Sequence, residues 1–526
     1  MEEYRPSHEG RSRMYKTNAR DQHEMRRKRR EDEIVIRKSR REEQFERNRK
    51  ITVERSLSQE ENSEMLRKVM DGLQSMNDEV IHDSLTRLHD NVKYNSWTVA
   101  VLAKAQILNK ISEVYCNRAI SNSIRQLIAE VFVITSKLPL QQKTSTDEKI
   151  IQSLVSNISN FAYDEDILCD TFQSIACFII RSLTYRNLAL DTAIVPELIG
   201  IGANHKSIIL HRALMWLVSL FCEKLDKYSP HVDEIAPLLE IIAGGITSTD
   251  AMVQTDAASA CASLSEWPPI YENMQEQKLC QMLVANLSND NGNARPKVKW
   301  AISCIIQATG YFTDDMINAG LLEVLKGFVN VSYMSQEICF IISNICVEGE
   351  HTEHTVDKLI DSGVLREVAR VMEASEYRSR KEAAFVICHC CASPHPRHLE
   401  YVIELGMLAA FTDLLTCMDV SLVSYILDAI TSLLQFGELY RQDNLNPVAV
   451  KLEEIGCRAK LEFLVGSQCF DIHAKAYTIL EKFYEEDEES ALAEQISDYQ
   501  TPNTIDNTID LILRTTANTT STHYSF

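Results

Sequence analysis

The segments INAGLLEVL (317–325), IDSGVLREV (360–368) and IELGMLAAF (403–411) are versions of one pattern, and each follows the last by 43 residues. An isoleucine opens every copy, and a glycine followed by an apolar run occupies its centre. A further copy, EEIGCRAKLEFL, brings its glycine to Gly456 after seven additional residues. Self-similarity at a nearly fixed period indicates a chain built from stacked repeats, each one a supersecondary unit.

Apolar residues in this region recur at the spacing of one helix face. The stripe around the first copy predicts a helix and consists of Ile317, Leu321, Val324, Leu325 and Phe328. A second predicted helix carries the stripe Tyr425, Ile426, Ala429, Ile430, Leu433 and Leu434. We expect the repeated glycine to end one helix or to open the next, where the backbone must bend.

Further copies lie between these segments and N-terminal to them, and the segments before residue 200 are more degenerate. They are HRALMWLVSLFCEK (211–224), RPKVKWAISCIIQATG (295–310), SQEICFIISNICVEG (335–349) and SRKEAAFVICHCCAS (379–393). A helical period of 40–47 residues is typical of armadillo and HEAT solenoids. Such a solenoid lines one concave groove with a helix from every repeat, which suits an extended peptide.

Composition excludes several classes of protein. With 45% hydrophobic and 25% charged residues among 526, the chain is neither mostly disordered nor a membrane protein by content. Its 16 glycines and 12 prolines are too few for a loop-rich all-β architecture. The start lacks the apolar run of a secretory signal, and no stretch reaches the roughly 18 apolar residues of a membrane span. We therefore expect cytosol or nucleus, with most of the 15 cysteines reduced and buried.

Charge is distributed unevenly between the N-terminal segment and the rest of the chain. Residues 11–50 carry sixteen basic and eight acidic side chains, a local balance of +8, which leaves −29 for the remainder of a chain with net charge −21. Such asymmetry predicts an interaction tail. Taken alone, the basic run also fits a solvated charge run, a nuclear-localisation signal or an RNA-binding patch. The acidic remainder disfavours direct nucleic-acid binding.

The basic run has a recognisable order. It reads Arg20-Asp21-Gln22-His23-Glu24-Met25, then Arg26-Arg27-Lys28-Arg29-Arg30, then Arg37-Lys38-Ser39-Arg40-Arg41. Together with the helical repeats, KEAAF (381–385), ILDAI (426–430) and the acidic EEDEE (485–489), this order resembles the importin-α (karyopherin-α) family over nearly the whole chain.

The resemblance implies an all-α fold, a right-handed superhelical armadillo solenoid of about ten repeats with a basic, largely disordered N-terminal arm. It implies three parts: an importin-β-binding segment at 1–58, the solenoid at 65–485 and an acidic, polar tail at 486–526. Importin-β would bind the cations of the first part, which are Arg20, Arg26, Arg27, Lys28, Arg29, Arg30, Arg37, Lys38, Arg40 and Arg41.

The implied activity is that of a nuclear import adaptor. Its groove would bind basic nuclear-localisation signals of cargo proteins, importin-β would hold the N-terminal segment, and an export receptor would recycle the chain between nucleus and cytoplasm. No cofactor, metal, direct nucleic-acid contact or membrane insertion is expected. The family also uses a Lys-Arg-Arg cluster as an internal competitor; the aligned residues 46–50 read ERNRK, so we expect weak self-inhibition.

In the family, each groove helix carries Trp and, four residues later, Asn. The Asn amide hydrogen-bonds the peptide backbone, while neighbouring indoles bracket the stems of cargo Lys and Arg and carboxylates pair with their charged ends. The major site, in repeats 2–4, departs heavily from this pattern. The first two aligned pairs are Glu130 and Ile134, and Gln173 and Cys177. The third keeps Trp216 but has Leu220 for Asn, with the family-like Arg212 before it, so Arg212 and Trp216 remain predicted groove residues.

Two further positions of this region also differ. Arg181 replaces an Asp that takes a cargo lysine in the family, and Ser259 and Ser263 replace the repeat 5 pair. We therefore expect the major site to be lost.

The minor site, in repeats 6–8, keeps more of the pattern. Glu337, Phe340 and Asn344 follow ExxWxxxN with Phe for Trp, and the next repeat has Glu382, Phe385 and His389 at the same spacing. Phe is a weaker cation–π partner than Trp but still a flat apolar wall. Basic peptides are expected to bind chiefly here, and weakly; alternatively, these rings are ordinary packing residues.

Other functions were weighed against an adaptor. A non-catalytic scaffold would hold importin-β or one dedicated partner with little general signal binding. An armadillo protein of the catenin kind needs a basic groove, which the acidic body disfavours. Nucleotide-binding and catalytic motifs are absent from the sequence, so an enzyme is not expected. Cys388, Cys391, His395 and His398 have zinc-like spacing, but buried thiols at a helix end explain them better.

Overall fold

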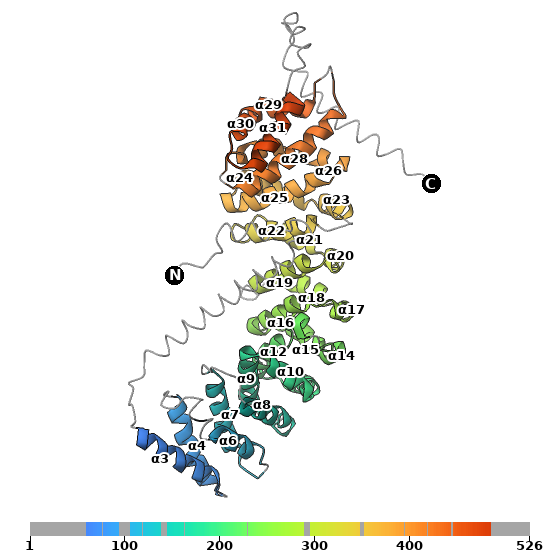
Figure 1. The fold of residues 1–526 in the computed structure, drawn as a ribbon. Coiled ribbons are helices and arrows are strands. Elements are labelled where there is room, and N and C mark those ends of the chain that lie inside the picture. The colour runs from blue at the N-terminus through green and yellow to red at the C-terminus, as the bar shows by residue number, and fades with distance from the viewer. Residues whose placement is uncertain are drawn as a thin grey trace, which may run out of the picture. The chain divides into compact units, whose positions relative to one another are not determined.

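The computed structural model describes residues 59–484 except 76, 94–101, 103–105, 118, 138–144, 162–163, 229, 289–294, 348–351, 394, 418 and 443–444. Within these residues every regular element is helical, apart from an isolated antiparallel bridge between Gln442 and Leu445. The all-α prediction is confirmed (Figure 1). All fifteen cysteines are free and most are buried, as expected for packing residues.

The described chain divides into two compact units, residues 59–312 and residues 313–484, here called the N-terminal and C-terminal units. The helices of the N-terminal unit are α3 (Gln59–Leu73), α4 (Asp78–Lys93), α6 (Ile107–Tyr115), α7 (Asn122–Lys137), α8 (Ser145–Ser156), α9 (Glu165–Arg181), α10 (Leu183–Asp191), α11 (Ile194–Asn204), α12 (Ile208–Phe221), α13 (Leu225–Tyr228), α14 (Val232–Ile235), α15 (Leu238–Ile246), α16 (Ala251–Leu264), α17 (Tyr271–Glu276), α18 (Leu279–Ser288) and α19 (Arg295–Ala308). Two short 3-10 helices, Ser159–Phe161 and Pro268–Ile270, lie between them.

The helices of the C-terminal unit follow in regular groups of three. They are α20 (Thr313–Asn318), α21 (Leu321–Phe328), α22 (Ser335–Cys346), α23 (Thr352–Ser362), α24 (Val364–Ala374), α25 (Tyr377–Ala392), α26 (Pro396–Glu404), α27 (Met407–Leu414), α28 (Val420–Glu438), α29 (Pro447–Glu454), α30 (Cys457–Val465) and α31 (Phe470–Tyr484).

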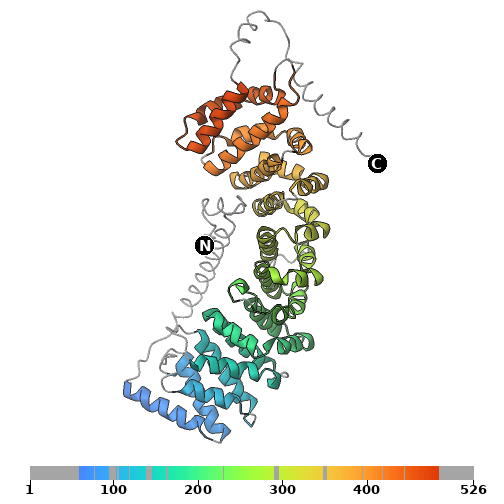
Figure 2. The same cartoon turned by 45° about the vertical axis from the view of Figure 1, so that its right-hand side comes forward.

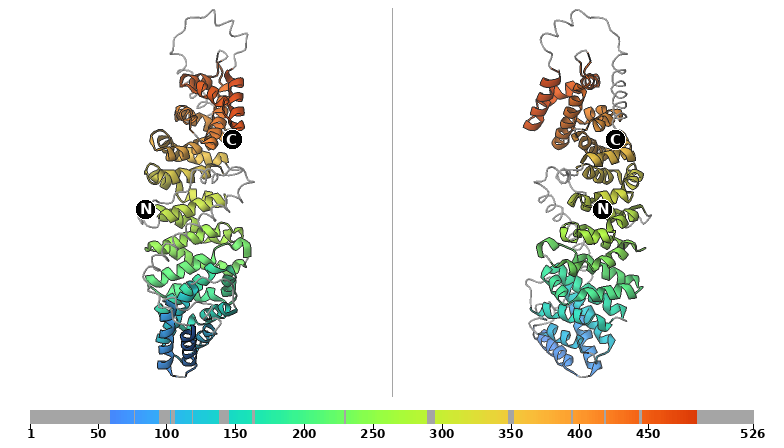
Figure 3. Two further views of the ribbon diagram at one scale, coloured as in Figure 1. Left: turned by 60° about the vertical axis from the view of Figure 1, so that its left-hand side comes forward. Right: turned by 90° about the vertical axis from the view of Figure 1, so that its right-hand side faces the viewer.

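One helix of each repeat stacks on its counterpart in the next repeat. In the N-terminal unit the successive neighbours are α4, α7, α9, α12, α16 and α19, and in the C-terminal unit they are α22, α25, α28 and α31. We call these the ladder helices; within each unit they lie one above another (Figure 2). Their apolar sides form the core, because a repeat buries its apolar face only against its neighbours. Other directions of view show the same repeating helical layers in each unit (Figure 3).

The repeated glycines fulfil the prediction made for them. Gly320, Gly363, Gly406 and Gly456 have φ between +73° and +92° and directly precede α21, α24, α27 and α30. Left-handed backbone is readily adopted only by glycine, so the chain turns there from one helix into the next. The prediction of a single helix carrying the stripe 317–328 was wrong, since the left-handed Gly320 divides that stripe between α20 and α21.

The second predicted stripe lies on a single helix, α28. Its apolar residues from Ile426 to Leu434 are buried between α25 and α31, and only Tyr425 stays half-buried. Among the described residues α28 is also the one helix long and apolar enough to cross a membrane. Its burial identifies it as a core helix of the C-terminal unit.

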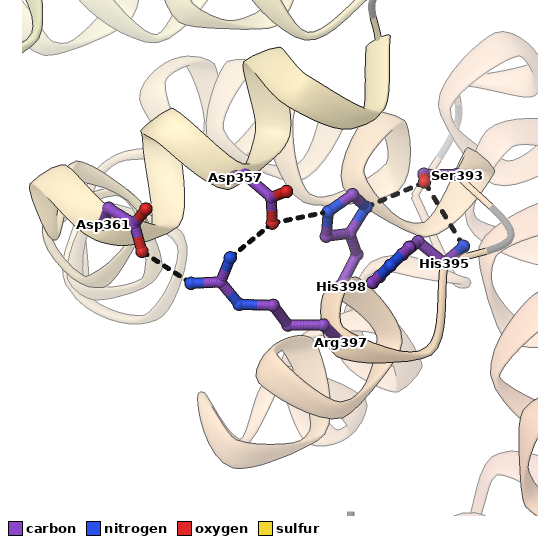
Figure 4. A network of polar contacts seen from close by, with 6 residues as sticks. All are labelled: Asp357, Asp361, Ser393, His395, Arg397 and His398. Atoms are coloured by element: carbon purple, nitrogen blue, oxygen red, sulfur yellow. Dashed lines mark hydrogen bonds and ion pairs between the residues drawn. The ribbon is translucent and has the colours of Figure 1, made fainter. Parts of the chain in front are cut away.

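Polar contacts add to the apolar stacking where α23 meets α26 (Figure 4). Arg397 donates to Asp357 at 2.6 Å and to Asp361 at 2.5 Å. The fully buried His398 contacts Asp357 through Nε2 at 3.2 Å and Ser393 Oγ through Nδ1 at 2.8 Å. Both ring nitrogens of His398 therefore have protein partners, and no group of three or more potential metal ligands occurs in the part of the chain that the structure describes.

Replacement by alanine should have opposite effects on stability at Gly406, which has a left-handed backbone, and at Gly327, which lies inside a helix. At both positions an added Cβ would meet no neighbouring atom within 4 Å, and at Gly406 it would strain the backbone itself. Gly406→Ala should lower the free energy of unfolding by about 1 kcal/mol, because alanine is strained at positive φ. Gly327→Ala, inside α21, should raise it by about 0.5–1 kcal/mol, because alanine favours the helix. Urea midpoints measure both changes. Equal effects of the two variants would contradict the assigned role of the turn.

Candidate peptide-binding site

The first ladder helix of the C-terminal unit presents three of the predicted site residues on one face. Glu337, Phe340 and Asn344 follow one another at spacings of three and four residues along α22, so they are neighbours on its surface. Glu337 and Phe340 are half-buried, whereas Asn344 is only 1% exposed. The Asn344 Nδ2 group donates to the carbonyl of Phe340 at 2.9 Å. This face combines a carboxylate, an aromatic ring and an amide.

The next ladder helix, α25, packs directly on α22 and repeats the pattern 45 residues later with Glu382, Phe385 and His389. All three side chains are buried. The structure therefore brings the six predicted minor-site residues onto two adjacent helices. It also makes α22 the more accessible of the two.

Two atoms at equivalent positions of these helices have unusual surroundings. The Oδ1 atom of Asn344 and the Nε2 atom of His389 are buried, and neither has a hydrogen-bond partner within the described residues. A buried polar group without a partner costs about 1–3 kcal/mol, so such groups are uncommon in native proteins. Burial also lowers the pKa of His389 to about 4, which leaves its imidazole neutral at pH 7.

Tyr425 explains part of the burial of Phe385, and sequence analysis did not select it for the site. Its ring meets Phe385 edge-on at a centroid distance of 5.4 Å and His389 at 5.5 Å. Burial, together with nearby Cys388 and Asp428, raises the pKa of Tyr425. Only its place in the apolar stripe of α28 was visible in the sequence, because the contact joins residues 40 apart.

A buried ion pair fixes α25 against α28 beside these rings. Lys381 is 3% exposed and pairs with Asp419, whose other carboxylate oxygen accepts from the Leu422 amide at 3.2 Å and so caps α28. Removing one member of such a pair leaves an uncompensated charge in the interior. The pair therefore holds α25 and α28 in one register.

In the N-terminal unit, Arg212 and Trp216 lie one turn apart on α12. Arg212 is exposed but makes a two-pronged contact with Asp250, at 3.0 Å from Nε and 2.6 Å from Nη2. This contact is the main cause of the lowered pKa of Asp250, which also caps α16. Trp216 is half-buried, and Leu220 in the Asn position is buried. Arg212 thus joins two ladder helices.

Other replaced positions of this unit take part in internal contacts. Glu130 lies 3.4 Å from His89 Nε2, and Arg181 approaches Asp147 at 3.9 Å while lying over the Phe178 ring. Arg181 has a lowered pKa because of burial. A second residue missed by the sequence analysis is Trp300 on α19, which is half-buried. Its segment had been aligned with that of Trp216, but its ring had not been given a role.

The ten predicted importin-β contacts from Arg20 to Arg41, and the tail 486–526, lie outside the described residues.

Comparisons with known proteins include these parts of the chain as well. Residues 11–93 match the family model "Importin beta binding domain", and residues 446–498 match "Atypical Arm repeat". Importin subunit alpha-1 of Caenorhabditis elegans is 69% identical to this chain over 98% of both proteins. The chain belongs to the importin-α family.

More distant comparisons concern one further importin-α and one solved structure. Importin subunit alpha-4 of Arabidopsis thaliana is 24% identical over 57% of this chain and 56% of its own length. An engineered protein of known crystal structure superimposes with a TM-score of 0.62 at 16% identity, covering 79% of this chain and 98% of its own, which shows likeness of fold alone. The predictions of family and armadillo fold are confirmed. As an importin-α, the chain is a nuclear import adaptor that carries an importin-β-binding domain.

The neutral, buried His389 predicts a specific pH dependence. Its folded pKa of about 4 lies below the ordinary value of 6.5, so the unfolded chain takes up the proton first as pH falls. The contribution of neutral His389 to the free energy of unfolding is complete above about pH 6.5 and declines toward pH 4. At pH 5 it is smaller by about 2 kcal/mol. His389→Gln should remove this part of the difference between the urea midpoints at pH 7 and pH 5. The exposed His354→Gln, on α23, serves as control, and an equal effect of both would refute the assignment.

Proposed function

We propose that this importin-α binds basic localisation signals chiefly on its C-terminal unit, along α22 and α25. The observation that carries the proposal is the pair of buried, unsatisfied atoms, Asn344 Oδ1 and His389 Nε2, at equivalent positions of adjacent ladder helices. An extended peptide offers a backbone N–H or C=O at regular intervals. Bonding to them would satisfy both groups without reading the peptide sequence.

Charge selection would come from Glu337 and from the ring of Phe340, both half-buried. The carboxylate lies one helical turn before the ring, so a lysine or arginine whose stem lies on the ring brings its cation toward the acid. Phe attracts a cation less strongly than Trp does, so affinity should be modest. Because Glu382 and Phe385 are buried, α22 would provide most of the charge selection and α25 mainly the backbone contact.

We further propose that importin-β binds the ten cations between Arg20 and Arg41, within the range that matches the importin beta binding domain. Cargo and importin-β would then occupy different parts of one chain, as an adaptor requires. Such a chain would move between cytoplasm and nucleus and need an export receptor for its return.

The last two helices have features that suit the export receptor. Phe463 on α30 is 75% exposed, Phe470 at the start of α31 is 82% exposed, and Tyr477 further along α31 is also exposed. Because α30 and α31 pack together, these aromatic side chains belong to one helical pair. Exposed aromatic side chains are enriched at protein interfaces.

The alternative is a scaffold that binds importin-β and one dedicated partner with little general signal binding. The contact of Arg181 with Asp147, at a position where the family has a cargo-binding Asp, favours it for the N-terminal unit. A titration with a generic basic-signal peptide discriminates the two functions.

In this titration, Glu337→Gln and Phe340→Ala should each weaken binding of a fluorescent basic-signal peptide by roughly fivefold, because each loses one contact with a cation. Fluorescence anisotropy of the full chain with saturating importin-β gives the dissociation constants. Glu323→Gln removes the same charge from an exposed site on α21 and should have little effect. Saturable binding that is insensitive to both site variants would refute the proposed site, and no binding at all would favour the scaffold.

For export, Phe470→Ser and Phe463→Ser together should lower affinity for the export receptor and raise the nuclear fraction of a fluorescently tagged chain. The reason is loss of apolar area that the interface would bury. Tyr333→Ser changes a side chain that is 74% exposed, outside α30 and α31, and should change neither quantity. An unchanged affinity in a direct binding assay of the double variant would count against this assignment.

A further inference from the structure

The last ladder helix, α31, leaves partly open a face that is buried in the ladder helix before it. It begins fifty residues after α28, the same interval that separates Gly406 from Gly456, so the two helices correspond position by position. On α28 one stripe at helical spacing is at most 2% exposed and consists of Val423, Leu427, Ile430 and Leu434. The corresponding residues of α31 are half-buried or exposed and are His473, Tyr477, Leu480 and Tyr484. We call these four residues of α31 the terminal face.

The position of α31 in the stack accounts for this difference. Among the described residues, α28 has ladder neighbours on both sides, α25 and α31, whereas α31 has only α28 (Figure 1). End repeats of a solenoid normally close it with a polar outer face. Here Tyr477 is 48% exposed, and its ring stacks on that of His473 at a centroid distance of 6.4 Å. The terminal face therefore resembles that of an internal repeat and is suited to being covered.

The residues that follow α31 in the sequence favour one more helix. Residues 485–489 read EEDEE, and acidic side chains are favourable in the first turn of a helix. Residues 491–495 read ALAEQ, which are good helix formers, and Pro502 marks the end of such a helix. The match to the atypical Arm repeat also continues past Tyr484 to residue 498. The last repeat is therefore longer in sequence than the helices α29 to α31.

This expected helix has an apolar stripe of its own. Leu492, Ile496 and Tyr499 recur at i, i+4 and i+7, which places them on one side of a helix. Glu494 and Asp498 each follow a stripe residue by two positions and so belong to the opposite side. Packing this stripe on the terminal face would remove apolar side chains of both from water.

We propose that residues 488–500 form a helix that packs antiparallel on the terminal face and caps the solenoid. Residues 485–487 would connect it to α31, a length typical of hairpins of two helices. Each helical residue advances the chain by about 1.5 Å, so Ile496 would lie beside Tyr477. The acidic, polar tail would then begin after this helix rather than directly after α31.

The tether favours this segment over any other cover. A segment three residues from α31 has a millimolar effective concentration, which a second copy of the chain or a separate partner does not reach at ordinary protein concentrations. Docking leaves Phe470 uncovered, because that ring lies at the opposite end of α31 from the connection. Docking also does not depend on peptide binding, so its failure would leave the proposed function untouched.

Hydrogen–deuterium exchange of the full chain, followed by mass spectrometry on peptides that cover residues 489–499, tests this docking. In the unmodified chain these amides should exchange about tenfold more slowly than in Leu492→Asp/Ile496→Asp, because a carboxylate on the stripe prevents burial. Ile505→Asp/Ile509→Asp makes the same two changes further along the chain and should leave the exchange rate as it is in the unmodified chain.

A change on the other surface separates docking from helix formation alone. Tyr477→Asp lies on α31, outside the segment whose exchange is measured, and should speed exchange of residues 489–499 by the same factor of about ten. Tyr333→Asp alters another exposed tyrosine of the C-terminal unit, outside α31, and should have no effect. Both tyrosines are exposed, so neither change removes a core contact of the repeats.

Rapid exchange of residues 489–499 in the unmodified chain, at the rate of an unfolded peptide, would overturn the proposal. Slow exchange that Tyr477→Asp leaves unchanged would overturn it too, since the helix would then form without docking on the terminal face. Protection of α31 that rises with protein concentration, while residues 489–499 stay unprotected, would assign the face to a second copy of the chain instead.

Discussion

No repeat of this importin-α can bury its own apolar face, and the architecture follows from that constraint. Each ladder helix needs the preceding and following ones as its interior, so α25 is covered by α22 and α28. The chain must return to the same orientation after every repeat, which the left-handed glycines before α21, α24, α27 and α30 allow. Stacking places equivalent positions of successive helices side by side, and this arrangement is what an extended ligand requires.

Stacking also buries polar and charged groups in the candidate site. Asn344 and His389 keep polar atoms in a buried environment without a partner, and Lys381 and Asp419 place a full ion pair there. The ion pair is internally compensated and fixes register, whereas the two single atoms are not. In the N-terminal unit, Arg212 pairs with Asp250 and Arg181 lies near Asp147.

Sequence alone predicted the repeats, the role of the glycines, the buried stripe of α28 and the placement of the six minor-site residues on adjacent helices. These features depend on periodicity, which is visible along one chain. It did not predict that Gly320 divides the stripe 317–328. Apolar residues on both sides of this turn face the core, so their spacing looks like that of one continuous helix. It also missed the Tyr425 contact with Phe385, since contacts between residues far apart in the chain cannot be read from spacing.

The unsatisfied atoms on α22 and α25 also affect the lifetime of the folded protein. Anything that binds only the folded chain stabilises it by mass action. If cargo satisfies Asn344 and His389, the loaded adaptor opens less often between these two helices than the empty one. Proteolytic turnover would then act first on adaptors without cargo, and the amount of adaptor in a cell would follow the supply of proteins waiting for import.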